Sequence, residues 1–342
     1  MKKKLIQGSF VALITPFNQD GTIDFGGFQT IIDFQAANGT SAVLFMGSTG
    51  ETSLLTKEEK RKIISETLKF KKSHMPFFYG CTGGSTRETI DMVRYAGKEG
   101  ADGAILTIPP YIVPPVNDAI HYFLEVADAS EIPIGIYNNP MRVGTDLPAD
   151  AIIRLADHPN IVIDKEAMGR PSQIAKIAAA KKEISLMCCD SPNLSLVVPT
   201  MSLGGHGTAN MTGNIAPQEM AIISTPWKSF EDALNFRETY LRILPLLEFT
   251  YSCINPIPVK SLAKILGLPS GDLRKPYRNL EGEALRKGAE IVKKLGLIEK
   301  YGYTSKSFDQ LGGGETGRSE RTTQAEGVGI AGTSGLTCTR ES

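Results

Sequence analysis

The sequence has few of the residues that build metal centres and disulfide frameworks. Its five cysteines include no Cys-x-x-Cys pair, and only four histidines are spread along its 342 residues. The adjacent Cys188 and Cys189 have no histidine close by in the sequence to complete a metal site. We therefore expect reduced thiols, no bound metal and a cytoplasmic location.

The chain also lacks an excess of charge and a long apolar run. Lysine and arginine number 37, as do aspartate and glutamate, which argues against binding to nucleic acid or to an anionic membrane. No apolar run reaches the roughly 18 residues of a membrane span. The basic start at residues 1–6 is not followed by a long apolar segment, so we expect no signal peptide.

Short apolar segments alternate with segments of helical pattern. Capping-box sequences at Thr56 and Ser85 predict the starts of two helices, the first running to about Lys72. The apolar segments are nearly continuous, as in strands buried on both faces, and lie at 10–14, 42–46, 77–80, 103–107, 134–137, 161–163, 184–187 and 205–209. This repetition predicts a (β/α)8 TIM barrel. A doubly wound sheet is the alternative, but no Gly-x-Gly-x-x-Gly follows the first strand.

The alternation stops near residue 225. We expect residues 1–225 to form the catalytic barrel, and helical patterns at 230–248, 256–266 and 280–295 predict a C-terminal helical domain at 226–300. From about residue 309 the sequence is rich in glycine, threonine and serine and poor in large apolar residues. We therefore expect residues 301–342 to be a disordered tail.

The residues at the strand ends indicate the chemistry, because TIM barrels carry their active sites there. Lys165 ends the sixth apolar segment. Burial favours the neutral form of an amine, and a neutral amine attacks a carbonyl carbon to form a Schiff base; a structural ion pair is the alternative role. The fifth segment ends in Tyr137, which can transfer protons, and is followed by Arg142, which can bind a carboxylate through two hydrogen bonds.

The second apolar segment is followed by Gly-Ser-Thr-Gly-Glu-Thr at 47–52. The two glycines allow backbone amides to approach a ligand, and hydroxyl groups flank them, which suits a small carboxylate. A simple turn is the alternative. Since the strand ends of a barrel share one rim, we expect this loop to converge with Lys165.

Together these motifs resemble those of the dihydrodipicolinate synthase / N-acetylneuraminate lyase family of class I pyruvate-dependent aldolases. Residues 47–51 match its GxTGE, residues 137–140 its YNxP and residues 165–167 its KEA, within a resemblance that covers about residues 5–297. Arg142 and the sequence Asn-Pro-Ile-Pro-Val-Lys at 255–260 are similar to the dihydrodipicolinate synthase branch, which serves lysine biosynthesis.

The resemblance implies the roles of the catalytic residues. Lys165 would form an imine with pyruvate, Tyr137 would relay protons, and Ser48 would be the next hydroxyl in the relay. Loss of a proton from the pyruvate methyl group then gives an enamine, which attacks an aldehyde. No cofactor and no metal are expected.

The resemblance also implies the substrate contacts. Backbone amides from Gly47 to Thr49 and the Thr49 hydroxyl would hold the pyruvate carboxylate, and Arg142 would hold the carboxylate of aspartate semialdehyde. Ala209, in the eighth strand, is a further expected substrate-binding residue.

Several residues depart from the family's pattern, and three of them bear on the chemistry of the site. Ser48 stands where the synthase branch has threonine, and Asp164 stands where an apolar residue usually precedes the lysine. The loop after the fourth strand normally has two adjacent tyrosines, the second of which reaches a neighbouring subunit's site. Here Ile112 stands at the second position, although a shift of one residue would place Tyr111 there.

These departures leave the Schiff-base chemistry intact and the second substrate open. A 2-keto-3-deoxy-acid aldolase or dehydratase of the same family is the first alternative, and a non-catalytic relative is the second. The resemblance also implies a homotetramer built from two tight dimers. We expect the apolar loop at 108–115 to be buried in the tight dimer, because it would be a liability on a monomer.

Overall fold

The computed structural model describes residue 3 and residues 5–304 of the chain. From residue 305 onward, the predicted disordered tail lies outside the described residues. No helix in the described part is both long and apolar enough to cross a bilayer.

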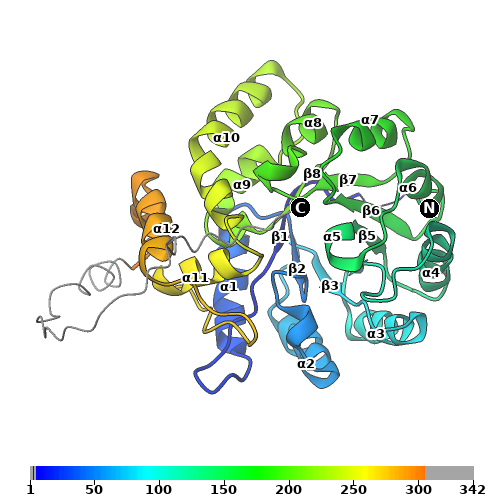
Figure 1. Cartoon of the computed structure of the whole chain (residues 1–342), viewed down its shortest axis with the longest axis horizontal. Coiled ribbons are helices and arrows are strands. Elements are labelled where there is room, and N and C mark those ends of the chain that lie inside the picture. The colour runs from blue at the N-terminus through cyan, green and yellow to red at the C-terminus, as the bar shows by residue number, and fades with distance from the viewer. Residues whose placement is uncertain (1–2, 4, 305–342) are drawn as a thin grey trace, which may run out of the picture.

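Eight parallel strands close into a barrel in which each strand pairs with its neighbours in sequence and β1 pairs with β8. The predicted TIM barrel is therefore confirmed, with a helix following each strand (Figure 1). The strands are β1 Gly8–Ala12, β2 Ala42–Phe45, β3 Phe77–Gly80, β4 Gly103–Leu106, β5 Ile134–Asn138, β6 Ile161–Glu166, β7 Ser185–Cys188 and β8 Gly207–Asn210.

The helices of the barrel surround the strands, except for the short α5, which lies inside the ring of outer helices in Figure 1. They are α1 Phe25–Ala37, α2 Lys57–Thr67, α3 Thr86–Glu99, α4 Val116–Asp128, α5 Pro140–Val143, α6 Ala149–Leu155, α7 Pro171–Ala179, α8 Val197–Ser202 and α9 Pro217–Ile223. Short 3-10 turns lie at η1 Thr52–Leu54, η2 Leu68–Phe70, η3 Pro192–Leu194 and η4 Thr212–Asn214.

The two predicted helix starts are both present, but only one has the full capping box. The Thr56 hydroxyl accepts from the Glu59 amide at 3.2 Å, and the Glu59 carboxylate accepts from the Thr56 amide at 2.9 Å. At α3 the Ser85 hydroxyl caps the helix, while the Glu88 carboxylate accepts from the Gly84 amide instead. The helix from Thr56 ends at Thr67 rather than near Lys72, because a 3-10 turn follows.

Four further helices follow the barrel: α10 Phe230–Thr250, α11 Ile257–Ile265, α12 Gly282–Lys294 and α13 Leu297–Tyr301. The last of these was not predicted. It is held to α9 by Glu219, whose carboxylate accepts from the Tyr301 hydroxyl at 2.5 Å and pairs with Lys300 at 2.7 Å. The Tyr303 hydroxyl donates to the Ile215 carbonyl at 2.5 Å, so the described chain stays packed on the barrel as far as its last residues.

The core has two layers, which follow from the alternation of side chains along each strand. One cluster fills the barrel and includes Phe10, Leu44, Phe78 and Met187. The second cluster lies between the strands and the surrounding helices. A residue's place along its strand therefore decides whether it faces the barrel interior or the helices.

The pairing of β5 with β6 contains an irregularity of one residue. Ile134 lies opposite Ile161, but Gly135 lies opposite Ile163, so that β6 has one extra residue. Beyond it, Tyr137 lies opposite Lys165. Such bulges redirect the side chains that follow them.

Asp164 is a buried carboxyl with no partner in the described part of the chain. It lies opposite Ile136 and Leu186, which belong to the layer between strands and helices. Both of its carboxylate oxygens lack a hydrogen bond there. Burial, followed by the nearby Glu166 carboxylate, raises the pKa of Asp164 well above its usual value.

We predict that Asp164→Leu stabilises the protein, most strongly at alkaline pH. Because the folded Asp164 holds its proton more tightly than the unfolded one, the free energy of unfolding falls as pH rises above about 4. Leucine removes both the ionisation and the unpartnered polar group, and should add about 1–3 kcal/mol at pH 8. Urea denaturation between pH 5 and pH 9 measures this.

Asp164→Asn is the matched control, since it removes the ionisable group but keeps a buried polar one. It should lose the same pH dependence with a smaller gain in stability. An Asp164→Leu protein no more stable than the parent at pH 8 would contradict the prediction.

Candidate active site

Lys165 and Tyr137 lie side by side at the C-terminal ends of β6 and β5. The Lys165 Nζ is 4.2 Å from the centroid of the Tyr137 ring. Lys165 is only 4% exposed, and no acidic side chain of the described residues lies within ion-pair distance of it. The structural ion pair that was the alternative role for this lysine is therefore not present among them.

The Tyr137 hydroxyl has a defined hydrogen-bond partner. The Asn139 amide nitrogen donates to the Tyr137 Oη at 2.7 Å. An amide nitrogen can only donate, so the tyrosine oxygen accepts and its own hydrogen remains available for another group.

The loop after β2 turns tightly toward the same rim. The Gly50 amide donates to the Gly47 carbonyl at 3.0 Å, and the Glu51 amide donates to the Ser48 carbonyl at 3.2 Å. A side chain at Gly50 would place its Cβ 3.2 Å from the Leu13 carbonyl oxygen, so glycine permits the close approach. In the described residues the amides of Ser48 and Thr49 donate to no backbone carbonyl, which leaves them available to an anion.

Asn255, from the segment before α11, joins this loop to Arg142. Its side-chain amide donates to the Thr49 Oγ1 at 3.0 Å, and its backbone carbonyl accepts from the Arg142 Nη2 at 2.9 Å. The Thr49 hydroxyl therefore keeps its own hydrogen for a ligand. Arg142, on α5, forms no ion pair with a carboxylate of the described residues.

A buried ion pair fixes the end of the same loop. The Lys260 Nζ lies 2.5 Å from the Glu51 Oε1, and both side chains are fully buried. Burial lowers the pKa of Lys260 to about 8, although the Glu51 carboxylate opposes this change. Glu51 also accepts from the Arg274 amide at 2.8 Å, and the Lys260 Nζ lies 4.0 Å from the centroid of the Phe17 ring.

Asn255, Lys260 and Glu51 were not among the predicted site residues. The signal in the sequence was the conjunction of Gly-Ser-Thr-Gly-Glu with Asn-Pro-Ile-Pro-Val-Lys. Each motif ends in one member of the ion pair, but nothing in the sequence indicates that residues 209 positions apart are in contact.

Polar contacts behind β6 hold the strand that carries Lys165. The Glu166 carboxylate accepts from the Asn138 side chain at 2.8 Å and from the Gln173 side chain at 3.0 Å. Burial raises the pKa of Glu166 to about 7, against the effect of these two hydrogen bonds. At the end of β7, Asp190 accepts from the Tyr251 hydroxyl at 2.6 Å and from the Thr212 amide at 3.0 Å.

The remaining predicted residues divide between the interior and the surface. Ala209 is buried with the residues that fill the barrel. Tyr111 is 96% exposed with a positive φ of 79°, and the neighbouring Ile112 is 57% exposed. Among the described residues, neither forms a hydrogen bond with Tyr137 of the same chain.

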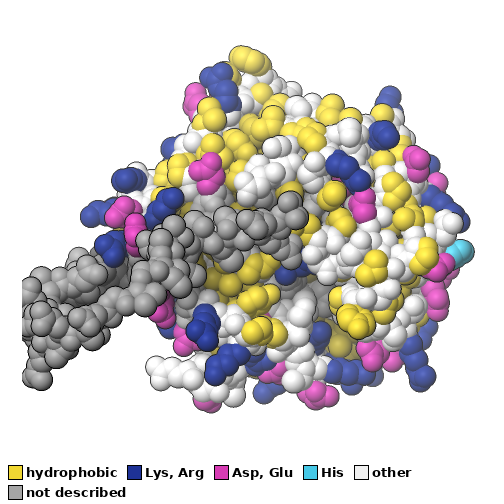
Figure 2. All heavy atoms as spheres, in the orientation of Figure 1, with side chains coloured by type: hydrophobic (Ala, Val, Ile, Leu, Met, Phe, Trp, Pro, Cys, Tyr) yellow, Lys and Arg dark blue, Asp and Glu magenta, His cyan; other side chains and the backbone are white. Residues whose placement is uncertain are grey.

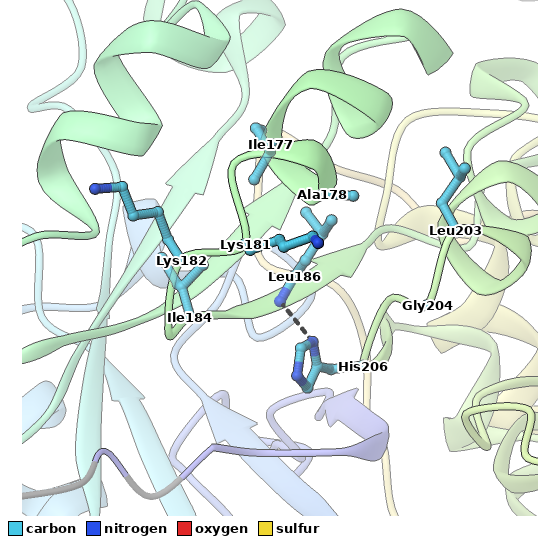
Figure 3. Close-up of a pocket in the computed structure, with 9 residues that line it drawn as sticks. All are labelled: Ile177, Ala178, Lys181, Lys182, Ile184, Leu186, Leu203, Gly204 and His206. Atoms are coloured by element: carbon cyan, nitrogen blue, oxygen red, sulfur yellow. Dashed lines mark hydrogen bonds between the residues drawn. The ribbon is translucent and has the colours of Figure 1, made fainter.

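A pocket, shown in Figure 3, lies where β7 and β8 begin and is therefore at the end of the barrel opposite to Lys165. Its volume is about 210 Å³. Some of its polar groups already have partners: the Leu186 amide donates to the His206 Nδ1 at 3.2 Å, and Lys182 pairs with Asp157 at 2.5 Å. It has no part in the rim around Lys165.

Comparison with known proteins identifies the family of the chain. Residues 5–295 match the model of the dihydrodipicolinate synthetase family. The chain belongs to this family. The 4-hydroxy-tetrahydrodipicolinate synthase of Syntrophotalea carbinolica is 35% identical over 298 residues, which are 86% of this chain and 100% of the relative.

Solved structures of the dihydrodipicolinate synthetase family have the same fold. The dihydrodipicolinate synthase of Aquifex aeolicus superposes with a TM-score of 0.80 at 33% identity, covering 85% of this chain and 98% of the relative. The chloride-inhibited enzyme of Acinetobacter baumannii, solved in complex with pyruvate, has a TM-score of 0.78 at 30% identity and covers 86% and 100%.

We predict that Lys260→Met destabilises the protein by about 3–5 kcal/mol, because it leaves the Glu51 carboxylate buried without its partner. The double variant Lys260→Met with Glu51→Gln removes both charges. It should lose clearly less stability than the sum of the two single variants. Urea denaturation of the four proteins tests this, and strictly additive losses would show that the pair is not coupled.

Proposed function

We propose that this chain is a 4-hydroxy-tetrahydrodipicolinate synthase, which condenses pyruvate with aspartate semialdehyde through a Schiff base on Lys165. The observation that carries the proposal is a buried lysine without an ion-pair partner in the described chain, placed against Tyr137 at the barrel rim. The relative from Acinetobacter baumannii was solved with pyruvate, which supports pyruvate as the first substrate.

The pyruvate half of the site would use the loop after β2. Backbone amides between Gly47 and Thr49, with the Thr49 hydroxyl, suit the carboxylate. The Lys165 nitrogen attacks the ketone carbon, and Tyr137, with Ser48 as the next hydroxyl, supplies the proton that lets the oxygen leave as water. The protonated imine then acidifies the pyruvate methyl group, whose loss of a proton gives the enamine.

The second half of the site would use Arg142. Its guanidinium is linked to the pyruvate loop through Asn255 and would bind the carboxylate of the incoming aldehyde. Ala209, in the wall of the barrel, would contact the substrate from β8.

A 2-keto-3-deoxy-acid aldolase or dehydratase is the second candidate. It is favoured by Ile112, which has no hydroxyl and stands where the synthase branch has the tyrosine that reaches a neighbouring subunit's site. A coupled assay of pyruvate with aspartate semialdehyde, run beside a panel of 2-keto-3-deoxy sugar acids, separates the two functions. Turnover of the sugar acids alone would remove the synthase assignment.

We also propose a cytoplasmic homotetramer made of two tight dimers. The apolar loop supports it, because Tyr111, Ile112 and Val113 are 96%, 57% and 54% exposed on the single chain, and Met141 is 65% exposed. In Figure 2 hydrophobic side chains gather nearer the middle of the face shown than the charged ones. Light scattering of the active protein tests the proposed homotetramer. Within each subunit, we propose that residues 1–225 and 226–300 act as one catalytic unit.

We predict that pyruvate with borohydride adds one pyruvate-derived mass to the protein, at Lys165. Lys260 is the internal control, because it is equally buried but is paired with Glu51. Peptide mass spectrometry locates the modification, and Lys165→Ala should abolish it together with nearly all turnover. Label on Lys260, or on any other lysine, would remove Lys165 from the reaction.

We predict that Arg142→Ala raises the KM for the aldehyde by about tenfold or more, because a carboxylate bound by a guanidinium contributes more than 1.4 kcal/mol. The KM for pyruvate should stay within about twofold. Arg142→Lys keeps the charge but loses the planar fork, so it should recover only part of the loss. Steady-state kinetics in both substrates measures this, and a selective rise in the pyruvate KM would place Arg142 in the other half of the site.

A further inference from the structure

We propose that Asn139 is a positioning residue that orients the hydroxyl of Tyr137 and stabilises its phenolate form during catalysis. This inference rests on the proposed Schiff-base function. It concerns a residue of the chain's own Tyr-Asn-Asn-Pro sequence at 137–140, and it assigns to that residue a hydrogen bond within one subunit.

The contact itself is short and directional. The Asn139 Nδ2 donates to the Tyr137 Oη at 2.7 Å, and both side chains are half-buried. In the described part of the chain, no other side chain forms a hydrogen bond with this hydroxyl. Asn139 therefore decides in which direction the phenol hydrogen can point.

The side chain of Asn139 makes this contact and does not cap the helix that follows it. Asn139 is the N-cap residue of α5, a position where asparagine commonly accepts a hydrogen bond from the first turn. Here its side chain makes no such bond. The helix start is formed without it, by Pro140 at the first position and by the Asn139 backbone carbonyl, which accepts from the Arg142 amide at 3.0 Å.

Other hydroxyl groups near the rim form no hydrogen bond with the Tyr137 hydroxyl in the described chain. Tyr111 is almost fully exposed. The Thr107 hydroxyl donates to the Thr82 hydroxyl at 3.4 Å, and the Thr49 hydroxyl accepts from Asn255. Within one chain, Asn139 is thus the group placed to control the phenol.

The chemistry gives this hydrogen bond a function. When Tyr137 protonates the departing hydroxyl of the carbinolamine, water leaves, and an iminium cation and a phenolate are formed together. The phenolate can then take a proton from the substrate methyl group, which yields the enamine and restores the phenol. A donor held on the oxygen stabilises the phenolate in both steps, and hydrogen bonds to charged groups are the stronger ones.

The test compares Asn139→Leu and Asn139→Asp, each made with Tyr137 and with Tyr137→Phe. The rate of pyruvate trapping on Lys165 by borohydride is followed by mass spectrometry. Asn139→Leu removes the donor and should slow trapping about tenfold or more, the scale of a hydrogen bond to a charged group. In the Tyr137→Phe background the same substitution should change the rate less than twofold, because Asn139 acts through the tyrosine.

Asn139→Asp separates positioning from helix capping. Aspartate caps a helix as well as asparagine does, but its carboxylate repels a phenolate and cannot donate to it. It should therefore slow trapping at least as much as leucine does, and the alkaline limb of the pH profile should move to higher pH in both variants. Thermal unfolding midpoints equal to that of the parent show that the variants are folded.

The outcomes distinguish the two proposals. A parent protein that traps no pyruvate refutes the proposed function. If the parent traps pyruvate and Asn139→Asp traps it equally fast, or if Asn139→Leu is as damaging with Tyr137→Phe as without it, only the role of Asn139 is refuted.

Discussion

The active-site rim depends on one buried ion pair, between Lys260 of α11 and Glu51 of the loop after β2. Each of these charges alone would be strongly unfavourable in the interior, and only their contact makes burial of both acceptable. The pair lies 2.5 Å apart with both side chains fully buried. It connects the loop proposed to bind the pyruvate carboxylate directly to a helix that follows the barrel.

Because of this connection, the C-terminal helical region takes part in forming the candidate site. The segment from Asn255 to Lys260 contacts the loop after β2 at two points and Arg142 at a third. The barrel supplies Lys165 and Tyr137. The helical region supplies the contacts that fix the positions of Arg142 and of the loop after β2. The site is therefore a joint product of both regions.

The sequence was sufficient for those features that depend on local pattern. Eight apolar segments predicted the barrel, and the ends of the fifth and sixth segments predicted that Tyr137 and Lys165 are neighbours. The roles of these two residues and of Arg142 stay predictions. The family resemblance added the expectation that the loop at 47–51 binds the pyruvate carboxylate. Long-range contacts were not predictable in this way, because the partner of Glu51 is 209 positions away and carries no periodic signal.

Local rules also misled where a side chain had two possible partners. Glu88 follows the capping-box spacing, but its carboxylate binds the Gly84 amide. Asp164 reads as a departure from the family's pattern, and only the packing reveals that it faces the apolar layer between strands and helices without a partner in the described chain.

The extra residue in β6 has a further consequence. In a regular ladder that begins with Ile134 opposite Ile161, the residue opposite Tyr137 would be Asp164, and Lys165 would be turned toward the helices. The bulge shifts the second half of the strand by one step, so that Lys165 faces the barrel and Asp164 faces away from it. Which side chain faces Tyr137 thus depends on the bulge: the same residues paired without it would place the Asp164 carboxyl, and not the Lys165 amine, opposite Tyr137.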